Sequence, residues 1–250
     1  MTTKQLIQKI EELSMNALPA LQTNVYDGWI VRFADGYTKR ANSINPIYFS
    51  KEDLNSKIES AEQLYRKRNL KVVYKMTQQV FPENLDKTLE KHGYFIDGLT
   101  SVQMLPLRDS NIEIGHKAIV YDTLHDNWLM NFYRLNNICE KDQRTLKQML
   151  LNIIPKSCYF LLNDENDETL ACGMCVLESE YIGLFDIVTT EKYRNKGFGS
   201  KLVQHILQWG KDNGAKYAYL QVMLNNLPAL KLYSKLGFEE IYRYWYRIKE

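Results

Sequence analysis

Residues 194–200, with the sequence RNKGFGS, combine glycine, positive charge and a helix start. They follow a strand-like run at 181–190 and open a helix-like run at 200–212. Gly197 and Gly199 let the backbone approach a ligand closely. The first amides of a helix lack intrahelical acceptors and form the positive end of its dipole. The segment therefore predicts an anion site, for which phosphate is the usual ligand.

Two other phosphate-binding loops do not fit this segment. A P-loop requires Gly-x-x-x-x-Gly-Lys-Ser/Thr, but Gly199 is followed by Ser200 and Lys201, and no glycine stands at the earlier position. A dinucleotide fingerprint requires a third glycine, and Leu202 occupies that position. What remains is Arg-x-x-Gly-x-Gly, beginning at Arg194. Taken alone, this hexapeptide is equally consistent with a basic turn that binds nothing.

A second motif follows downstream. Residues 216–223 are rich in strand-forming residues, and residues 225–238 read NNLPALKLYSKLGF. Pro228 suits the first turn of a helix, and Gly237 suits the position just after its end. The order is therefore strand, asparagine, helix and a final Leu-Gly-Phe.

Together the two motifs resemble the GNAT acyltransferase superfamily, and the close resemblance covers roughly residues 170–250. It implies that the loop amides hold the pyrophosphate of acetyl-CoA. It also implies that a β-bulge splays the preceding strand from its neighbour, so that the strand backbone pairs with the pantetheine arm. By resemblance, the cofactor-binding residues are Ile187, Val188, Thr189, Arg194, Asn195, Lys196, Gly197, Phe198, Gly199, Ser200 and Asn226.

The resemblance also implies catalytic residues. Tyr233 matches the family tyrosine that protonates the departing thiolate, although its helical spacing with leucines is also typical of a core residue. A base must deprotonate the acceptor amine, and Asp186, Glu178 and Glu180 are candidates. Asp186 precedes the expected bulge within an apolar run, where a carboxylate should have a raised pKa. Glu178 and Glu180 fall in an expected turn, so Asp186 is the predicted base.

The composition is ordinary for a globular protein. The 250 residues are 45% hydrophobic and 25% charged, with a net charge of +2. This charge implies no extended nucleic-acid surface. No apolar run approaches the length of a membrane span, and the first residues are too polar for a secretory signal. We therefore expect no nucleic-acid or membrane partner and a cytoplasmic location.

The Cys-Gly-Met-Cys segment at 172–175 lies in a strand-like run. A second Cys-x-x-Cys pair that would complete a zinc site is missing from the sequence. Buried strand cysteines are the preferred interpretation, and we expect no metal.

The chain repeats itself weakly. Residues 52–67, 70–76, 82–92 and 94–105 are expected to form a helix, a strand, a helix and a strand, which is the order found near the C-terminus. Residues 41–48 hold no Arg-x-x-Gly-x-Gly loop where the first repeat should carry one. We therefore expect one cofactor site.

These patterns predict a mixed α/β (α+β) protein with tandem GNAT-like folds. Each fold has a mixed central sheet flanked by helices, and the second holds the splayed β-bulge strand. The expected domains are a degenerate N-terminal unit at 1–110 and a catalytic N-acetyltransferase domain at 111–250, with a helix over 120–136.

The segment at 26–43 is dense in aromatic residues, glycine and charge. It resembles the N-terminal segment of some two-domain GNAT proteins. Tyr37, Arg40 and Asn42 would suit an acceptor pocket, but a hairpin that braces the first unit is the preferred interpretation.

The predicted function is direct transfer of an acetyl group from acetyl-CoA to the primary amine of a small molecule. The alternatives are a non-catalytic acyl-CoA-binding protein and an N-acetyltransferase that acts on a protein or peptide. A monomer and a homodimer are both consistent with the sequence, and no residue pattern identifies the amine.

Overall fold

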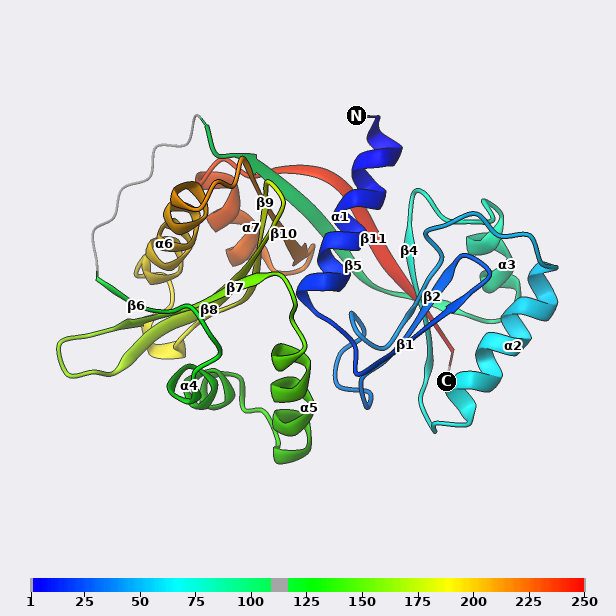
Figure 1. Ribbon diagram of the computed structural model, residues 1–250, viewed down its shortest axis with the longest axis horizontal. Helices are drawn as coiled ribbons and strands as arrows, with labels where there is room; N and C mark the ends of the chain where they lie inside the picture. The colour runs from blue at the N-terminus through cyan, green and yellow to red at the C-terminus, as the bar shows by residue number, and fades with distance from the viewer. Residues whose placement is uncertain (1, 109–116, 250) are drawn as a thin grey trace. The chain divides into compact units, whose positions relative to one another are not determined.

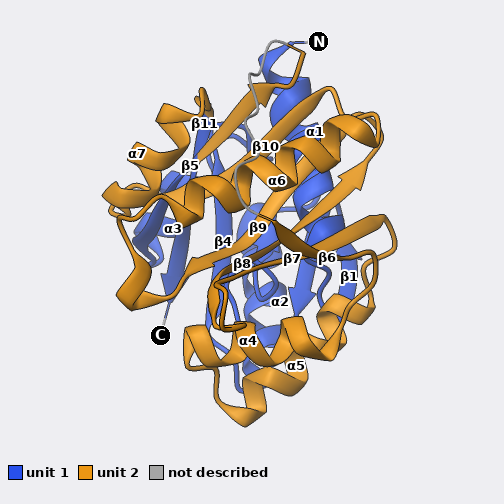
Figure 2. Cartoon of the chain, turned by 90° about the vertical axis from the view of Figure 1, so that its left-hand side faces the viewer, with its two compact units in different colours: residues 1–101, 242–250 blue, residues 102–241 orange. Residues whose placement is uncertain are grey.

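The computed structural model describes residues 2–108 and 117–249. The chain forms two compact units, one of residues 1–101 and 242–250 and the other of residues 102–241 (Figure 2). In this division most of the last strand, from residue 242 onward, is grouped with the first unit, whereas the sequence-based proposal places all of residues 111–250 in one domain. The predicted boundary at 110/111 lies outside the described residues.

The first unit contains strands that hydrogen-bond in the order β1-β2-β3-β4-β11-β5. Two of these strands, β5 and β11, contribute residues to both units. The elements are α1 (Thr3–Ala17), β1 (Gln22–Tyr26), β2 (Trp29–Phe33), β3 (Ile44–Asn45), α2 (Leu54–Arg66), β4 (Val72–Thr77), α3 (Leu85–Lys91), β5 (Phe95–Pro106) and β11 (Glu239–Lys249).

Strands β1 and β2 form an antiparallel hairpin at residues 22–33, which begins four residues before the segment at 26–43 for which a hairpin is the preferred interpretation. The turn residues Asp27 and Gly28 both have positive φ, which suits Asp-Gly. Asn42 is buried, and its side-chain oxygen accepts hydrogen bonds from the amides of Ala34 and Gly36 at 2.7 and 3.0 Å. The Asn42 side chain therefore braces the chain after the hairpin.

The core of the first unit is aromatic. The rings of Trp29 and Tyr94 each pack edge-on against Tyr74, with both centroid distances at 5.5 Å. Helix α2 places Ile58 and Tyr65 in this core, and both lie on the apolar face expected from their helical spacing.

The second unit contains strands in the order β5-β10-β9-β8-β7-β6. Its pairs are antiparallel from β6 to β9, whereas β9 and β10 are parallel. Its further elements are β6 (Ala118–Tyr121), α4 (Asp126–Asn136), α5 (Glu140–Leu151), β7 (Lys156–Asn163), β8 (Thr169–Glu178), β9 (Tyr181–Thr189), the 3-10 turn η1 (Glu191–Tyr193), α6 (Phe198–Asp212), β10 (Tyr217–Met223) and α7 (Leu227–Lys235).

The predicted helix over 120–136 is wrong at its start. Ala118–Tyr121 form the strand β6, and α4 begins only at Asp126, where the side chain of His125 accepts a hydrogen bond from the Asn127 amide. A strand of four residues is too short to show a clear alternation of apolar residues, so its sequence does not distinguish it from the first turn of the helix that follows.

Helices cover both faces of the sheet in the second unit. Helices α6 and α7 pack with each other on one face, and α4 packs against β7, β8 and β9 on the other (Figure 1). The apolar core on the α6 face includes Phe160, Leu184, Leu202 and Tyr233. The predicted fold class, a mixed α/β sheet flanked by helices, is confirmed.

Within the described part of the chain, every helix is too short or too polar to cross a membrane.

Candidate active site

Strand β9 carries a bulge at the centre of the second unit. Opposite it on β8, Cys172 pairs with Val188 and Met174 pairs with Phe185, so the register shifts between these two pairs. Two β9 residues, 186 and 187, therefore face one β8 residue, which is the definition of a β-bulge.

On its other side, β9 separates from β10. The parallel register runs from the Tyr181–Tyr217 pair to the Leu184–Leu220 pair, whereas β9 itself continues to Thr189. A splayed, bulged strand is therefore present where the sequence predicts one. The positions predicted to bind the pantetheine arm, 187–189, lie in the part of β9 beyond this register.

The predicted phosphate loop joins β9 to α6. Asn195 and Gly197 both have positive φ, at 60° and 85°. Helix α6 begins at Phe198, two residues earlier than the sequence predicts, and Gly197 is its N-cap. A Cβ atom at Gly197 would meet open space. The first turn of α6 therefore directs its N–H groups out of a helix end that carries no side chain at the cap.

Gly199 lies one residue inside the helix and is tightly packed. A Cβ atom there would lie 3.0 Å from Leu232 Cδ1 and 3.1 Å from Thr189 Oγ1. Glycine at this position thus allows α6, α7 and the end of β9 to approach one another.

Basic side chains surround the loop. Arg194 forms a long, exposed ion pair with Glu191 at 3.9 Å, and pairs of this kind contribute little to stability. Lys196 Nζ lies 5.2 Å from the ring centroid of Tyr193, and Lys201 Nζ lies 5.2 Å from that of Phe198. A glycine-capped helix end with exposed basic side chains has the chemistry of a phosphate site.

Tyr233 lies in α7 on the α6 face of the sheet. It is 8% exposed and its ring packs edge-on against Phe238, with the centroids 5.8 Å apart. Burial raises the pKa of Tyr233 to about 12. The hydroxyl therefore keeps its proton at neutral pH, as a general acid must. Its core packing fits the structural interpretation as well, and the catalytic role stays a prediction.

Asp186 is the bulge residue itself, with φ at 53° and a half-buried side chain. Burial, with a smaller contribution from the Asp186 charge, raises the pKa of the Cys172 thiol. Burial and the same charge also raise the pKa of Tyr159, whose ring contacts Trp128 of α4. The Asp186 charge is therefore close enough to Cys172 and Tyr159 to influence both groups.

The other predicted residues have identifiable contacts. Ile187 packs on the core of the α6 face. Asn226 is the N-cap of α7, and its side chain accepts a hydrogen bond from the Ala229 amide at 3.3 Å. Among the rejected bases, Glu180 forms an ion pair with Lys216 at 2.8 Å. This contact agrees with the solvated role expected for Glu180.

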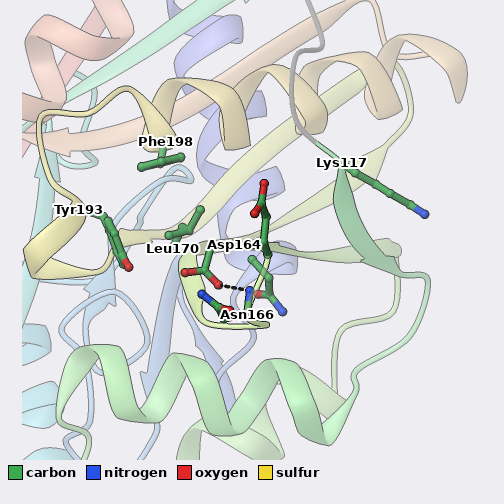
Figure 3. A pocket seen from close by; sticks show the side chains of 8 residues that line it. Lys117, Asp164, Asn166, Leu170, Tyr193 and Phe198 are labelled. Atoms are coloured by element: carbon green, nitrogen blue, oxygen red, sulfur yellow. Dashed lines mark hydrogen bonds between the residues drawn. The ribbon is translucent and has the colours of Figure 1, made fainter.

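A cavity of about 560 Å³ adjoins the start of α6 (Figure 3). Phe198 and Tyr193 line one side, and Asp164 lies on the β7–β8 turn opposite. The Asp164 carboxylate accepts hydrogen bonds from the Asn166 and Glu168 amides, both at 2.9 Å. The acidic turn disfavours phosphate in this cavity, so the basic loop at 194–197 is the better anion site.

The cysteines of the Cys-x-x-Cys segment are buried in β8, as predicted. Burial raises the pKa of both Cys172 and Cys175. Among residues 2–108 and 117–249, His, Cys, Asp and Glu side chains form no group of three that would hold a metal ion.

Sequence reasoning overlooked two residues near the bulge. Gly173 of β8 faces the bulge, and Trp128 of α4 donates a hydrogen bond to its carbonyl. A glycine inside a strand is itself a signal for a bulge or a close approach, so the position of Gly173 in a strand-like run could have indicated the bulge. The contact with Trp128 is long-range and has no local signal.

Comparison with known protein families gives two matches. Residues 121–238 match the acetyltransferase (GNAT) family. Residues 3–135 match a family described as probable histone acetyltransferase Rv0428c C-terminal. Together the two matches extend over most of the chain.

Individual relatives agree with these matches. An uncharacterized N-acetyltransferase, YobR of Bacillus subtilis, is 29% identical over 250 residues, covering 97% of this chain and 98% of that protein. A streptothricin acetyltransferase of Escherichia coli is 26% identical over 92 residues, covering 32% of this chain and 53% of that protein. The solved structure of a GCN5-related N-acetyltransferase from Kribbella flavida superposes with a TM-score of 0.71 at 13% identity, covering 97% and 95% of the two chains.

Proposed function

The chain belongs to the GNAT acetyltransferase family, and from this premise we propose that it transfers the acetyl group of acetyl-CoA directly to the primary amine of a small molecule. The family and the N-acetyltransferase relatives make it an acyltransferase enzyme rather than a non-catalytic acyl-CoA-binding protein. The proposal concerns the identity of the two substrates, with acetyl-CoA as the donor and a small-molecule amine as the acceptor.

One observation carries the choice of donor. The bulged end of β9 is followed by the short turn η1 and the glycine loop, which lead into the glycine-capped first turn of α6. A splayed strand offers backbone groups to an extended amide-containing arm, and the helix end suits a pyrophosphate. Acetyl-CoA contains both parts, joined in this order. The basic side chains of Arg194 and Lys196 add attraction for its phosphates.

Three groups of the chain supply the chemistry. Asp186 takes a proton from the ammonium form of the acceptor, and the neutral nitrogen then attacks the thioester carbonyl and loses its second proton to solvent as the amide forms. A backbone N–H of β9 beyond the bulge stabilises the oxyanion that forms. When the carbon–sulfur bond breaks, Tyr233 donates its hydroxyl proton to the leaving thiolate. The raised pKa of Tyr233 keeps that proton in place beforehand.

The comparisons support two classes of acceptor, a small-molecule amine and a protein amine. The streptothricin acetyltransferase relative is named for a small molecule, which favours a small-molecule amine. The description of the family that matches residues 3–135 names a histone acetyltransferase, which favours a protein amine as the second candidate.

The test is an acceptor screen with two arms. The protein is incubated with acetyl-CoA and either small primary amines or lysine-containing peptides, and thiol release is measured together with acetylated product by mass spectrometry. We expect thiol release to match product formation in the small-amine arm. Product in the peptide arm alone would replace the proposed acceptor with the second candidate. Thiol release in neither arm would contradict the proposed transfer.

A further inference from the structure

The carbonyl of Gly173 has an unusual partner for a residue in the middle of a sheet. The indole Nε1–H of Trp128 donates a hydrogen bond to it at 3.0 Å, and the bond is buried. Trp128 belongs to α4, so the contact joins a helix on one face to the backbone of β8. Buried carbonyl groups require a partner, because leaving one unpaired is costly.

The position of this bond coincides with the bulge. Gly173 is the β8 residue at which the β8–β9 register shifts, between the pairs of Cys172 and Met174. A bulge inserts an extra residue and disrupts the ladder locally. The indole N–H thus contributes a hydrogen bond at the point where the regular ladder is interrupted.

Both ends of the bond are held rigidly. Trp128 is fully buried, stacked on Phe132 at 5.0 Å and packed edge-on against Tyr159 at 5.0 Å. On the opposite face, a Cβ atom at residue 173 would lie 2.5 Å from Ile187 Cδ1. Ile187 of the bulge therefore sits directly against the Gly173 backbone. A shift of that backbone would displace Ile187 and, with it, the strand segment that follows.

From these contacts we propose that Trp128 is a positioning residue, which fixes the bulge of β9 so that its backbone meets the thioester arm of acetyl-CoA. The proposal rests on the function proposed above. Trp128 acts through Gly173 and Ile187 and touches neither substrate. Oxyanion stabilisation by a backbone N–H depends on preorganised geometry, so a loosened bulge should weaken binding of the arm and leave the phosphate loop intact.

The experiment compares Trp128→Phe with two matched controls. Trp209→Phe removes an indole on the α6 face, where Trp209 packs edge-on against Phe160. Phe132→Leu disturbs the stack around Trp128 but keeps its N–H. For each variant, calorimetry measures the Kd of acetyl-CoA and of 3′-phospho-ADP, which lacks the pantetheine arm. Hydrogen exchange of the free protein measures protection of residues 185–189.

We expect Trp128→Phe to bind acetyl-CoA about fivefold more weakly, the effect of one lost hydrogen bond, and to bind 3′-phospho-ADP as the wild type does. Exchange at residues 185–189 should be faster in this variant and unchanged in Trp209→Phe. Phe132→Leu should retain most of the acetyl-CoA affinity. Trp128→His, which keeps a ring N–H, should lie closer to the wild type and serves as the second variant if Trp128→Phe does not fold.

Other outcomes overturn the proposal. An equal loss of affinity for both ligands, or the same loss in Phe132→Leu, would show that packing rather than the hydrogen bond matters. Faster exchange with unchanged acetyl-CoA affinity would show that the bond has no bearing on the donor. A wild-type protein that binds neither ligand would contradict the proposed function instead, and the exchange measurement alone would then decide whether Trp128 holds the bulge.

Discussion

At the scale of single residues, the proposed acetyl transfer requires first the Tyr233 hydroxyl as a proton donor. Tyr233→Phe keeps the ring and its contact with Phe238 and removes only the proton donor. Because general acid catalysis typically contributes about 10²- to 10⁴-fold, kcat should fall within this range. Acetyl-CoA affinity and melting temperature should stay near the wild-type values. Unaltered kcat, with chemistry shown to limit the rate, would assign Tyr233 to the core alone.

The pH dependence of this step has a definite direction. Burial raises the pKa of Tyr233 from 10.0 to about 12, so the hydroxyl keeps its proton as the pH rises through the ordinary tyrosine range. The ratio of wild-type kcat to that of Tyr233→Phe should therefore stay constant up to about pH 10 and decline only above it. Kinetics measured on both proteins across the alkaline range check this, and a decline of the ratio near neutral pH would argue against the assignment.

Asp186 allows a separate test of the base. Its φ of 53° lies in the left-handed region, which asparagine tolerates well. Asp186→Asn thus removes the charge with little backbone strain. We expect kcat/KM for the amine to fall by about 10²-fold or more, with acetyl-CoA binding maintained. A variant as active as the wild type would leave amine deprotonation to another group or to solvent.

At the scale of secondary-structure elements, the first turn of α6 is the critical feature. Gly199→Asp introduces a negative charge into the first turn of α6, beside the expected phosphate, and Gly199→Ala introduces the same Cβ contacts with Leu232 and Thr189 without charge. An acidic residue near a helix N-terminus is itself favourable, so the aspartate variant should fold. Its acetyl-CoA affinity should be about 100-fold below that of the alanine variant. Equal Kd values for the two variants in calorimetry would show that the site does not bind an anion.

Local sequence signals predicted the elements around this turn because glycine, proline and apolar periodicity are all local. Gly197 and Pro228 marked the starts of α6 and α7 to within two residues. The sequence did not lead us to predict strand β6 or helix α1. Strand β6 is too short to leave a periodic pattern. Helix α1 does have a local signal, the capping box that Thr2 and Gln5 form at its start.

At the scale of the whole molecule, long-range pairing set the limit of what the sequence could show. Strand β11 pairs with β4 from Tyr244–Thr77 to Lys249–Val72, so the C-terminal residues return to the first unit. The sequence contains no local sign of this pairing, because partners far apart in the chain leave no periodic signal. The positive φ of Asp186 and the hydrogen bond between Trp128 and Gly173 also depend on neighbours far away in the sequence, so no local pattern predicts them.

The chain as a whole carries one Arg-x-x-Gly-x-Gly loop, at 194–199, and the corresponding segment of the first unit, at 41–48, has none. We expect this loop and the bulged β9 to form a single donor site. Titration calorimetry of the full-length wild-type protein with acetyl-CoA tests this expectation most directly. Binding should be saturable, with one acetyl-CoA per chain. Two equivalent sites per chain, or no binding at all, would contradict it.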